Sequence, residues 1–475
     1  MAMLALLFGI CSIIGVYSNI YIDVTHSKIV QRIDYKFVGS ILDCGMIKHN
    51  WGTFDFNSAK MLALAKGLGP SYLRVGGTDA DYMVFTRNNN ARNKRFILGP
   101  STKGHPNFYI MASDWDKLNH FVQTVGWDLI YDLNIAPRKN GKWDPTNTID
   151  LLKYTAEKGY KVYGLELGNE INISPQFHVS AAQSGQDFLA LKHLLPTIHG
   201  LHIPKIFGPD VTNLDVVSFT ESFLTHGGRE AVDAVTFHHY YMGGSHASVL
   251  EYRSAHVLDS LKHKVDTAIN TCKKYAPGKP VWLAETSVAW SSAPNNLNNQ
   301  YVASFAWLDK LGISAQRGIK AVLRQTFYGG LISKSLDPNN DYWITYLYKR
   351  LVGDGVLSVS FGGDTHLRAY AHCTRVPSSH GYNKGSVTII LMNIGLNTMP
   401  VEIKGGHTQH LYLFSPGDSH GLNSESIKLN GHVLKLDSHN NFPNMPPVSH
   451  TGTVQVGPAA IGFIVLPDAN HSACR

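Results

Sequence analysis

Short apolar runs alternate with longer amphipathic stretches over most of the chain. Seven stretches have helical periodicity, at residues 57–68, 113–125, 148–158, 185–195, 216–226, 257–275 and 298–310. Eight apolar runs have the length of buried strands, at 37–43, 72–75, 127–134, 161–167, 205–210, 234–241, 280–287 and 318–325. Polar residues collect where these runs end. The alternation predicts an α/β fold, a (β/α)8 TIM barrel whose functional side chains follow the strands.

The pattern changes beyond residue 351. Helical periodicity gives way to short alternating strands, such as 387–391 and 462–466, separated by turns rich in Gly, Asn and Pro. We interpret residues 351–475 as a β-sandwich domain packed on a catalytic barrel of residues 36–350. The alternating run within residues 19–35 is expected to join the sandwich, so that both chain ends belong to the smaller domain.

Residues 1–18 form an apolar segment with small residues near its end. We interpret it as a secretory signal peptide although it lacks the usual basic start, with a buried strand or a membrane anchor as the alternative. No later run of about 20 apolar residues follows, so no integral membrane segment is expected. We expect an extracellular monomer, or a lysosomal one. Asn172 and Asn470 begin N-glycosylation sequons.

Composition narrows the class of partner. With 44% hydrophobic and 16% charged residues, the chain can bury a sizeable core. Its net charge of +7 suits an anionic partner, including an acidic polysaccharide, but charge alone does not choose among sugar, nucleic acid and membrane surface. The sequence has no zinc-finger spacing and no RNP-like aromatic signature, so a nucleic-acid partner is not expected.

Two of the predicted strands end on a glutamate. The fourth run turns at Gly168 and presents Asn169 and Glu170, and the seventh carries Glu285 near its end. In a barrel these ends face each other across the mouth. Glycoside hydrolysis needs one carboxyl group that protonates the leaving oxygen and one that attacks or activates water. We assign Glu170 as the acid/base and Glu285 as the nucleophile. The alternative for each is an ordinary solvated loop residue.

Other polar side chains at the strand ends extend this candidate site. His238 and Tyr240 follow the sixth strand, where they are placed to orient the nucleophile or to contact sugar, or else to pack in the core. Asn169 is placed to hydrogen-bond a sugar hydroxyl. Arg74 and Arg324 are placed to hold the carboxylates electrostatically, with a structural salt bridge as the alternative.

Two other chemistries fit the sequence less well. The pair His238 and His239 invites a metal, but adjacent side chains on a strand point to opposite faces. The chain has no Gly-x-Ser-x-Gly elbow, and Ser287 lacks a triad spacing. We therefore expect neither a metal nor a cofactor.

Six motifs, in this combination and order, resemble the heparanase-like endo-β-glucuronidases of glycoside hydrolase family 79. They are YLRVGGT at 72–78, ELGNE at 166–170, GPDV at 208–211, HHYY at 238–241, WLAETS at 282–287 and WLDKLG at 307–312. The resemblance covers nearly the whole chain after residue 18. It implies Glu170 as the proton donor and Glu285 as the nucleophile, in agreement with the reasoning from the strand ends.

The resemblance also implies sugar contacts from Asp43, Thr78, Asn169, His238 and Tyr240. We add Trp290, Ser291, Ser292 and Gln325 as further candidates for substrate binding. It implies a disulfide between Cys373 and Cys474, which leaves Cys44 and Cys272 as free thiols.

The chain departs from the family pattern around the uronate pocket. The loop after the nucleophile reads Trp290-Ser291-Ser292 where relatives have a tyrosine and glycines whose backbone N–H groups hold the uronate carboxylate. Tyr328 is a candidate for the family's carboxylate-binding tyrosine.

The basic residues also differ from those of the family. Two basic clusters that bind heparan sulfate in the best-known members are missing, and cations lie instead at 87–95 and at 138–142, where they either flank an anionic cleft or form a solvated surface. We predict a secreted, retaining endo-β-glucuronidase that acts on heparan sulfate. The alternatives are a hyaluronan endo-β-glucuronidase or an exo-β-glucuronidase of the same family and, from another class, a catalytically silent glycosaminoglycan-binding protein.

Overall fold

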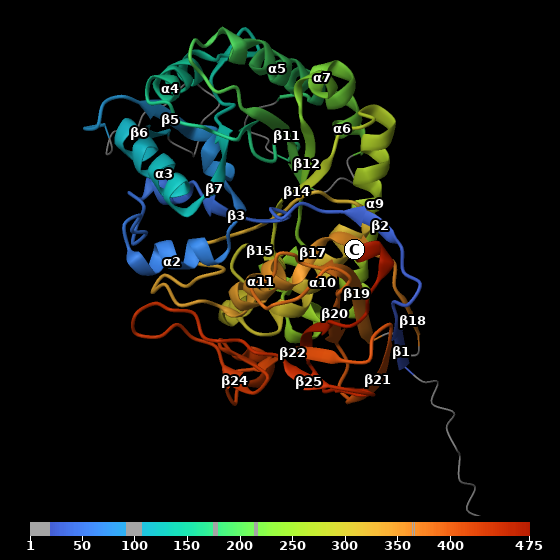
Figure 1. The fold of residues 1–475 in the computed structure, drawn as a ribbon. Helices are drawn as coiled ribbons and strands as arrows, with labels where there is room; N and C mark the ends of the chain where they lie inside the picture. Colours follow the sequence, from blue (N-terminus) through green and yellow to red (C-terminus); the bar gives the residue numbers. More distant parts are fainter. Residues whose placement is uncertain (1–19, 92–106, 174–178, 213–216, 363, 365) are drawn as a thin grey trace, which may run out of the picture.

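The computed structural model describes residues 20–91, 107–173, 179–212, 217–362, 364 and 366–475. The segment interpreted as a signal peptide lies outside these residues. Eight parallel strands close into a barrel, and this confirms the predicted (β/α)8 fold (Figure 1). The barrel strands are β3 (Val38–Asp43), β4 (Ser71–Gly76), β7 (Trp127–Leu133), β10 (Gly164–Leu167), β11 (Lys205–Thr212), β12 (Ala234–His239), β14 (Val281–Thr286) and β16 (Val322–Arg324).

One long helix follows each barrel strand along the chain. These helices are α2 (Ala59–Gly67), α3 (Ala112–Val125), α4 (Thr146–Glu157), α5 (Ala181–Leu194), α6 (Val217–Phe223), α9 (Ala255–Tyr275), α10 (Ala303–Arg317) and α11 (Asn340–Leu351). Shorter helices are α1 (Gly45–Lys48), α7 (Arg229–Ala231) and α8 (Val249–Tyr252). Three two-stranded ribbons decorate the barrel: β5 (Met83–Thr86) with β6 (Phe108–Met111), β8 (Arg138–Lys139) with β9 (Lys142–Trp143), and β13 (Met242–Gly243) with β15 (Ala289–Trp290).

The barrel strands are apolar because both of their faces are covered. Every residue of β4, β12 and β14 is buried, since helices cover the outside of the barrel and inward side chains fill its interior. An aromatic layer of Tyr72, Phe207 and Trp282 packs inside the barrel near the strand starts. The opposite, C-terminal ends of the strands are therefore the place for a functional cleft.

The seventh barrel helix differs from the prediction. It was expected at 298–310, but α10 begins at Ala303 and ends at Arg317. Residues 298 and 299 belong instead to a 3-10 helix, and the extended backbone of Gln300, with a ψ of 164°, separates this helix from α10. The helix continues past the expected end until Gly318, whose φ of 96° closes it.

The eighth barrel helix, α11, was not predicted. It lies between the barrel and the smaller domain (Figure 1), and most of its residues are buried, including the charged Asp341 and Lys349. A helix that is buried on nearly all sides lacks the solvated face that makes helical periodicity visible in a sequence.

The C-terminal part of the chain forms two antiparallel-rich sheets below the barrel in Figure 1. The larger sheet contains β2 (Ile29–Arg32), β17 (Val352–Leu357), β19 (Leu367–Thr374), β20 (Val387–Asn393), β27 (Ile461–Leu466), β22 (Gln409–Pro416), β23 (Ile427–Leu429), β24 (His432–Val433) and β25 (Val448–His450). The smaller sheet contains β18 (Ser360–Gly362), β1 (Ile20–Asp23), β21 (Met399–Lys404) and β26 (Val454–Val456). Strand β21 alternates buried and exposed residues, as a sheet with one solvated face should.

The first two strands pair with strands from the far end of the chain. In β1, Ile20 lies opposite Val401 of β21 in a parallel pairing, and in β2, Gln31 lies opposite Val356 of β17 in an antiparallel pairing. Strand β1 therefore lies among the C-terminal strands in Figure 1.

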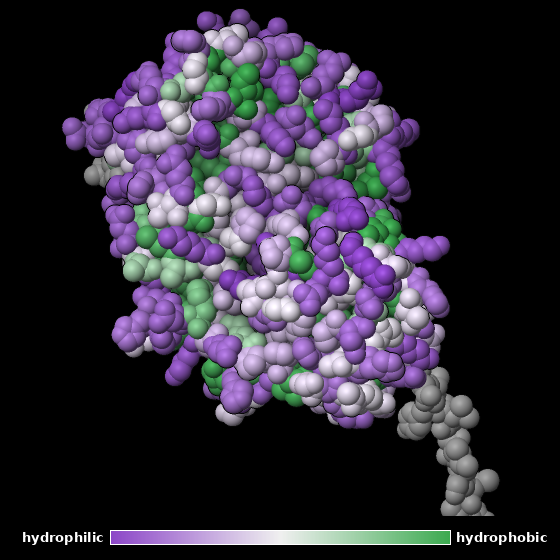
Figure 2. Space-filling view, in the orientation of Figure 1, coloured by the Kyte–Doolittle hydropathy of each residue, from purple (hydrophilic) through white to green (hydrophobic). Residues whose placement is uncertain are grey.

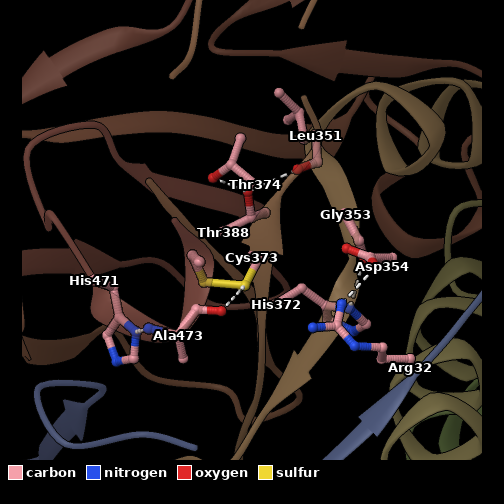
Figure 3. The surroundings of a disulfide bond; sticks show 11 residues. Arg32, Leu351, Gly353, Asp354, His372, Cys373, Thr374, Thr388, His471 and Ala473 are labelled. Atoms are coloured by element: carbon pink, nitrogen blue, oxygen red, sulfur yellow. Dashed lines mark hydrogen bonds and ion pairs between the residues drawn. A yellow bond between two sulfur atoms is a disulfide. The ribbon is translucent and has the colours of Figure 1, made fainter. Parts of the chain in front are cut away.

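A disulfide joins Cys373 on β19 to Cys474 near the C-terminus, as the family resemblance implied (Figure 3). It closes a loop of 101 residues and so fastens the chain end to the larger sheet. Cys44 and Cys272 are buried and unpaired.

The two parts of the molecule share polar contacts as well as apolar ones. Arg368 Nε and the Tyr370 hydroxyl on β19 each donate to an oxygen of Asp309 on α10, at 2.6 Å. The Tyr301 hydroxyl donates to the backbone oxygen of Phe414 at 3.0 Å.

The outer face in Figure 2 is mostly hydrophilic, with small scattered apolar patches. No helix in the described part of the chain is both long and apolar enough to cross a membrane.

Candidate active site

A cleft of about 720 Å³ opens at the C-terminal ends of the barrel strands. Its lining comes from loops after several different strands, and it includes Asp43, Glu170, Tyr240, Glu285 and Gln325. The volume lies within the range of small-ligand sites. The fold thus brings the two predicted catalytic glutamates into one cleft, although 115 residues separate them in the sequence.

Glu170 reaches the cleft through a tight turn after β10. Gly168 has a φ of 83°, and a Cβ there would lie 3.0 Å from Ile135, so a larger residue would be strained and crowded. Glu170 itself has a left-handed backbone with a φ of 50°, and its N–H donates to the Asp210 carbonyl at 3.0 Å. The turn directs the Glu170 side chain to the cleft.

Glu285 lies near the end of β14 and is held by two hydrogen bonds. Arg74 Nη1 donates to its Oε2 and the Tyr240 hydroxyl donates to its Oε1, both at 2.7 Å. Burial raises the pKa of Glu285, but His238, Arg74 and the Tyr240 hydrogen bond together outweigh burial and hold the pKa below its usual value. Glu285 is therefore ionised, as a nucleophile must be.

His238 lies between two carboxylates. Its Nδ1 is 2.9 Å from Glu170 Oε1, and its Nε2 is 3.4 Å from Asp210 Oδ1. Burial lowers the pKa of His238, but Glu285, Asp210 and Glu170 stabilise the imidazolium and raise the pKa to about 10. A protonated ring donates from both nitrogens, which matches the two acidic partners.

The two glutamates are close to each other. One carboxylate oxygen of Glu170, one of Glu285 and a ring nitrogen of His238 all lie within 4.8 Å of one another. Three such groups are near enough to share a cation, but a protonated imidazole has no lone pair to offer a metal. The arrangement therefore fits two carboxyl groups beside a protonated histidine better than a metal centre.

Further carboxylates lie beneath the site, and sequence reasoning assigned them no role. Arg74 Nε donates to Glu166 Oε2 at 2.6 Å, and Arg74 Nη2 lies 3.6 Å from Asp132 Oδ2. Burial raises the pKa of Glu166 to about 7, against the opposing effect of Arg74. Burial also raises the pKa values of Asp132 and Asp81 well above their usual range. Arg74 thus connects Glu285 to a buried group of acids.

The structure places six of the nine predicted substrate-binding residues in the cleft lining: Asp43, Tyr240, Trp290, Ser291, Ser292 and Gln325. The other three lie outside the lining. Thr78 is exposed at the start of a short 3-10 helix, and His238 is buried behind Glu170. Asn169 is buried with its Oδ1 accepting from Arg74 Nη2 at 2.9 Å, so its present contact positions the arginine.

Two further candidates have structural partners. Arg324 Nη2 donates to Asp341 at 2.8 Å and its Nη1 donates to the Ser287 hydroxyl at 2.9 Å. Tyr328 is buried, contacts the Thr53 hydroxyl and donates to a backbone carbonyl. Tyr328 is not among the residues that line the cleft.

Ion pairs neutralise some of the basic residues at 87–95 and 138–142. Arg87 forms ion pairs with Asp150 and Glu157, and Arg138 forms an ion pair with the buried Asp187 at 2.7 Å. The remaining cations between 92 and 103 lie outside the described residues.

Comparisons with known proteins identify the family. Residues 20–312 match the profile described as glycosyl hydrolase family 79, N-terminal domain. The chain belongs to glycoside hydrolase family 79. It is 32% identical to mouse heparanase, with 94% of this chain and 92% of the relative covered. It is 31% identical to the hyaluronoglucuronidase of Hirudo nipponia, with 96% and 99% covered.

Other matches limit the activity that can be concluded from family membership. The chain is 30% identical to mouse inactive heparanase-2, with 96% of this chain and 90% of the relative covered. The crystal structure of a 4-O-α-L-rhamnosyl-β-D-glucuronidase from Fusarium oxysporum shares the fold with a TM-score of 0.66 at 14% identity, covering 93% and 97%. The predicted resemblance to family 79 is confirmed, and the chain is a glycoside hydrolase.

Proposed function

We propose that this family 79 protein is a secreted, retaining endo-β-glucuronidase that cleaves glucuronic acid linkages in an acidic polysaccharide, with heparan sulfate as the first candidate. The observation that carries the mechanism is the separation of at most 4.8 Å between an oxygen of Glu170 and an oxygen of Glu285. Retaining enzymes place their carboxyl groups about 5–5.5 Å apart, whereas inverting enzymes leave about 6.5–9.5 Å for a water molecule.

The two glutamates divide the chemistry according to their surroundings. Glu285 attacks the anomeric carbon while Glu170 gives its proton to the departing glycosidic oxygen, which forms a glycosyl-enzyme and frees one sugar chain. Glu170 then takes a proton from water, and the water oxygen displaces Glu285 from the sugar. Arg74, Tyr240 and His238 support the ionised nucleophile, which faces the more exposed Glu170 across the cleft.

Secretion is supported by two independent features. Residues 1–18 have the pattern of a signal peptide. The disulfide between Cys373 and Cys474 is of a kind that persists in oxidising compartments. We propose an extracellular or lysosomal location on these grounds.

Hyaluronan is a second candidate substrate, and one observation favours it. Among the described residues that line the cleft, Arg324 is the sole cation, and its guanidinium is already bonded to Asp341. A polysaccharide whose only charge is the uronate carboxylate needs fewer cationic partners from the cleft lining than a sulfated polysaccharide does. The leech relative that matches this chain is named for hyaluronan cleavage.

The proposed function is tested by product analysis. Purified protein is incubated at mildly acidic pH with heparan sulfate and, separately, with hyaluronan, and the products are sized by chromatography. Glu170→Gln is expected to slow cleavage by about 10²–10⁴-fold, and Glu285→Gln is expected to abolish it. Glu402→Gln, at an exposed position of β21, is the matched control and should cleave like the wild type.

The outcomes separate the candidates. Fragments from one polymer would choose between heparan sulfate and hyaluronan. Full activity in Glu285→Gln would exclude the two-carboxylate mechanism. Absence of fragments from both polymers would leave two candidates. One is an exo-glucuronidase, which would still hydrolyse a small aryl glucuronide, and the other is a catalytically silent glycosaminoglycan-binding protein.

A further inference from the structure

One end of the cleft is lined by amides. We call Asn296, Asn298 and Asn299 the asparagine ledge; they lie on the short 3-10 helix Pro294–Asn299 and line the cleft together. Asn299 Nδ2 donates to Asn296 Oδ1 at 2.9 Å and to the Gly329 carbonyl at 3.4 Å. The ledge is therefore fixed to the loop after the eighth barrel strand before any substrate arrives.

The ledge is also anchored from behind. Asn298 Oδ1 accepts from the Tyr252 hydroxyl at 2.6 Å, and Asn298 Nδ2 donates to the Ala289 carbonyl at 3.2 Å. These bonds tie the ledge to Ala289, the first residue of β15. The second residue of β15 is Trp290, which is half-exposed in the cleft wall. A rigid amide surface can form hydrogen bonds with the polar groups of a sugar, and the aromatic ring beside it can pack against the apolar face of the sugar ring.

The charge around the ledge is negative. Asn296 Nδ2 donates to Glu425 Oε1 at 3.4 Å, which places an exposed carboxylate beside the ledge. The described cleft lining adds Asp43 and the two catalytic glutamates, against the single guanidinium of Arg324, which is 2% exposed and already paired. Among the residues that the structure describes here, a sulfate group would face carboxylates and no free cation, and like charges placed together disfavour binding.

We infer that the cleft selects unsulfated, N-acetylated stretches of its acidic polysaccharide, with the asparagine ledge facing the hexosamine. An acetamido group has one N–H donor and one carbonyl acceptor, which side-chain amides can pair with in both directions. The inference rests on the proposed function and narrows it: hyaluronan meets this requirement along its whole length, and heparan sulfate meets it in its unmodified segments.

The test compares two polymers with the same backbone. One is N-acetylated and unsulfated, the other is N- and O-sulfated, and both are supplied at equal uronate concentration. We expect the unsulfated polymer to be cleaved at least about tenfold faster, the lower end of discrimination by a binding pocket. Glu425→Gln and Asn296→Lys should each raise the relative rate on the sulfated polymer, because they remove a negative charge or add a positive one.

Matched controls assign the effect to the ledge. Glu402→Gln makes the same chemical change on β21, and Thr451→Lys adds the same charge on the exposed turn between β25 and β26. Neither control should change the ratio of the two rates. Equal or faster cleavage of the sulfated polymer by the wild type would overturn the inference while leaving the proposed function intact, and so would unchanged ratios in Glu425→Gln and Asn296→Lys.

A binding assay keeps the inference testable even if no polymer is cleaved. Short oligosaccharides of each polymer are titrated into Glu285→Gln, and tryptophan fluorescence is followed, with Trp290→Phe in the same background as the control that assigns the signal to the cleft. Tighter binding of the unsulfated oligosaccharide would support the selectivity even if catalysis, and with it the proposed function, failed. Tighter binding of the sulfated one through the Trp290 signal would refute it.

Discussion

Replacement of Tyr240 by phenylalanine should change the pH dependence of catalysis. The Tyr240 hydroxyl donates a 2.7 Å hydrogen bond to the buried carboxylate of Glu285, and the substitution removes that bond with almost no change of shape. A hydrogen bond to a charged group contributes about 1.5–3 kcal/mol. At 1.36 kcal/mol per pH unit, the pKa of Glu285 should rise by about one to two units.

The sign follows from the role of nucleophile proposed for Glu285. Its carboxylate must be ionised to attack, so activity is lost as the pH falls through its pKa. A higher pKa therefore moves the acidic limb of the kcat/KM profile to higher pH, by the same one to two units or so. The profile is measured with a labelled oligosaccharide of whichever polymer the wild type cleaves.

Tyr241→Phe is the matched control. The Tyr241 hydroxyl is buried, has no hydrogen-bond partner among the described residues and lies outside the cleft lining. Its loss should leave the acidic limb in place. An unmoved limb in Tyr240→Phe, or an equal displacement in both variants, would refute the claim that Tyr240 stabilises the ionised nucleophile.

Three further predictions concern stability and modification. The pKa of Glu166 is raised from 4.5 to about 7, so its contribution to the free energy of unfolding is complete below pH 4.5. This contribution is lost as the pH rises towards 7, by about 3 kcal/mol. Chemical denaturation at several pH values should show this loss in the wild type and not in Glu166→Gln. Replacing Cys373 and Cys474 together by alanine should cost about 2–5 kcal/mol of unfolding free energy, read by thermal or chemical unfolding, because the bond closes a 101-residue loop; an unchanged midpoint would contradict this. In protein secreted from a eukaryotic host, Asn470→Gln should remove a glycosidase-sensitive mass, whereas Asn172→Gln should not, because both ends of the Asn172 amide are bonded to the Thr212 backbone; a glycan at position 172 would show that this loop opens.

That Glu170 and Glu285 share one cleft was predictable because each interrupts a clear pattern. Glu170 and Glu285 each follow an apolar run at the point where a buried strand reaches solvent, and parallel strands of a barrel bring all such points to one face. The few residues on either side of each glutamate are enough to show that a buried strand ends there.

The buried acids beneath the pair were not predictable in the same way. Glu166 stands between two leucines of an apolar strand and reads as part of a buried run, yet its partner Arg74 is 92 residues away. The ion pair depends on which strands become neighbours and on which side of the barrel each side chain points. Periodicity along one strand contains neither fact. The helix α11 was missed for a related reason, since its burial depends on a second domain covering its outer face.

The pairing of β1 with β21 sets the order in which the molecule can be completed. Residues 20 and 401 are neighbours in the sheet, so the first strand waits for about 380 more residues to be synthesised. At roughly 5–20 residues per second, that wait lasts about 20–80 s. Until then the edge that pairs with β21 stays open, and the other edge is open until its partner β18 has been synthesised. An unpaired strand edge is the condition that invites aggregation or capture by a chaperone. The larger sheet has the same constraint, because it can be completed only after β27, at residues 461–466, has left the ribosome.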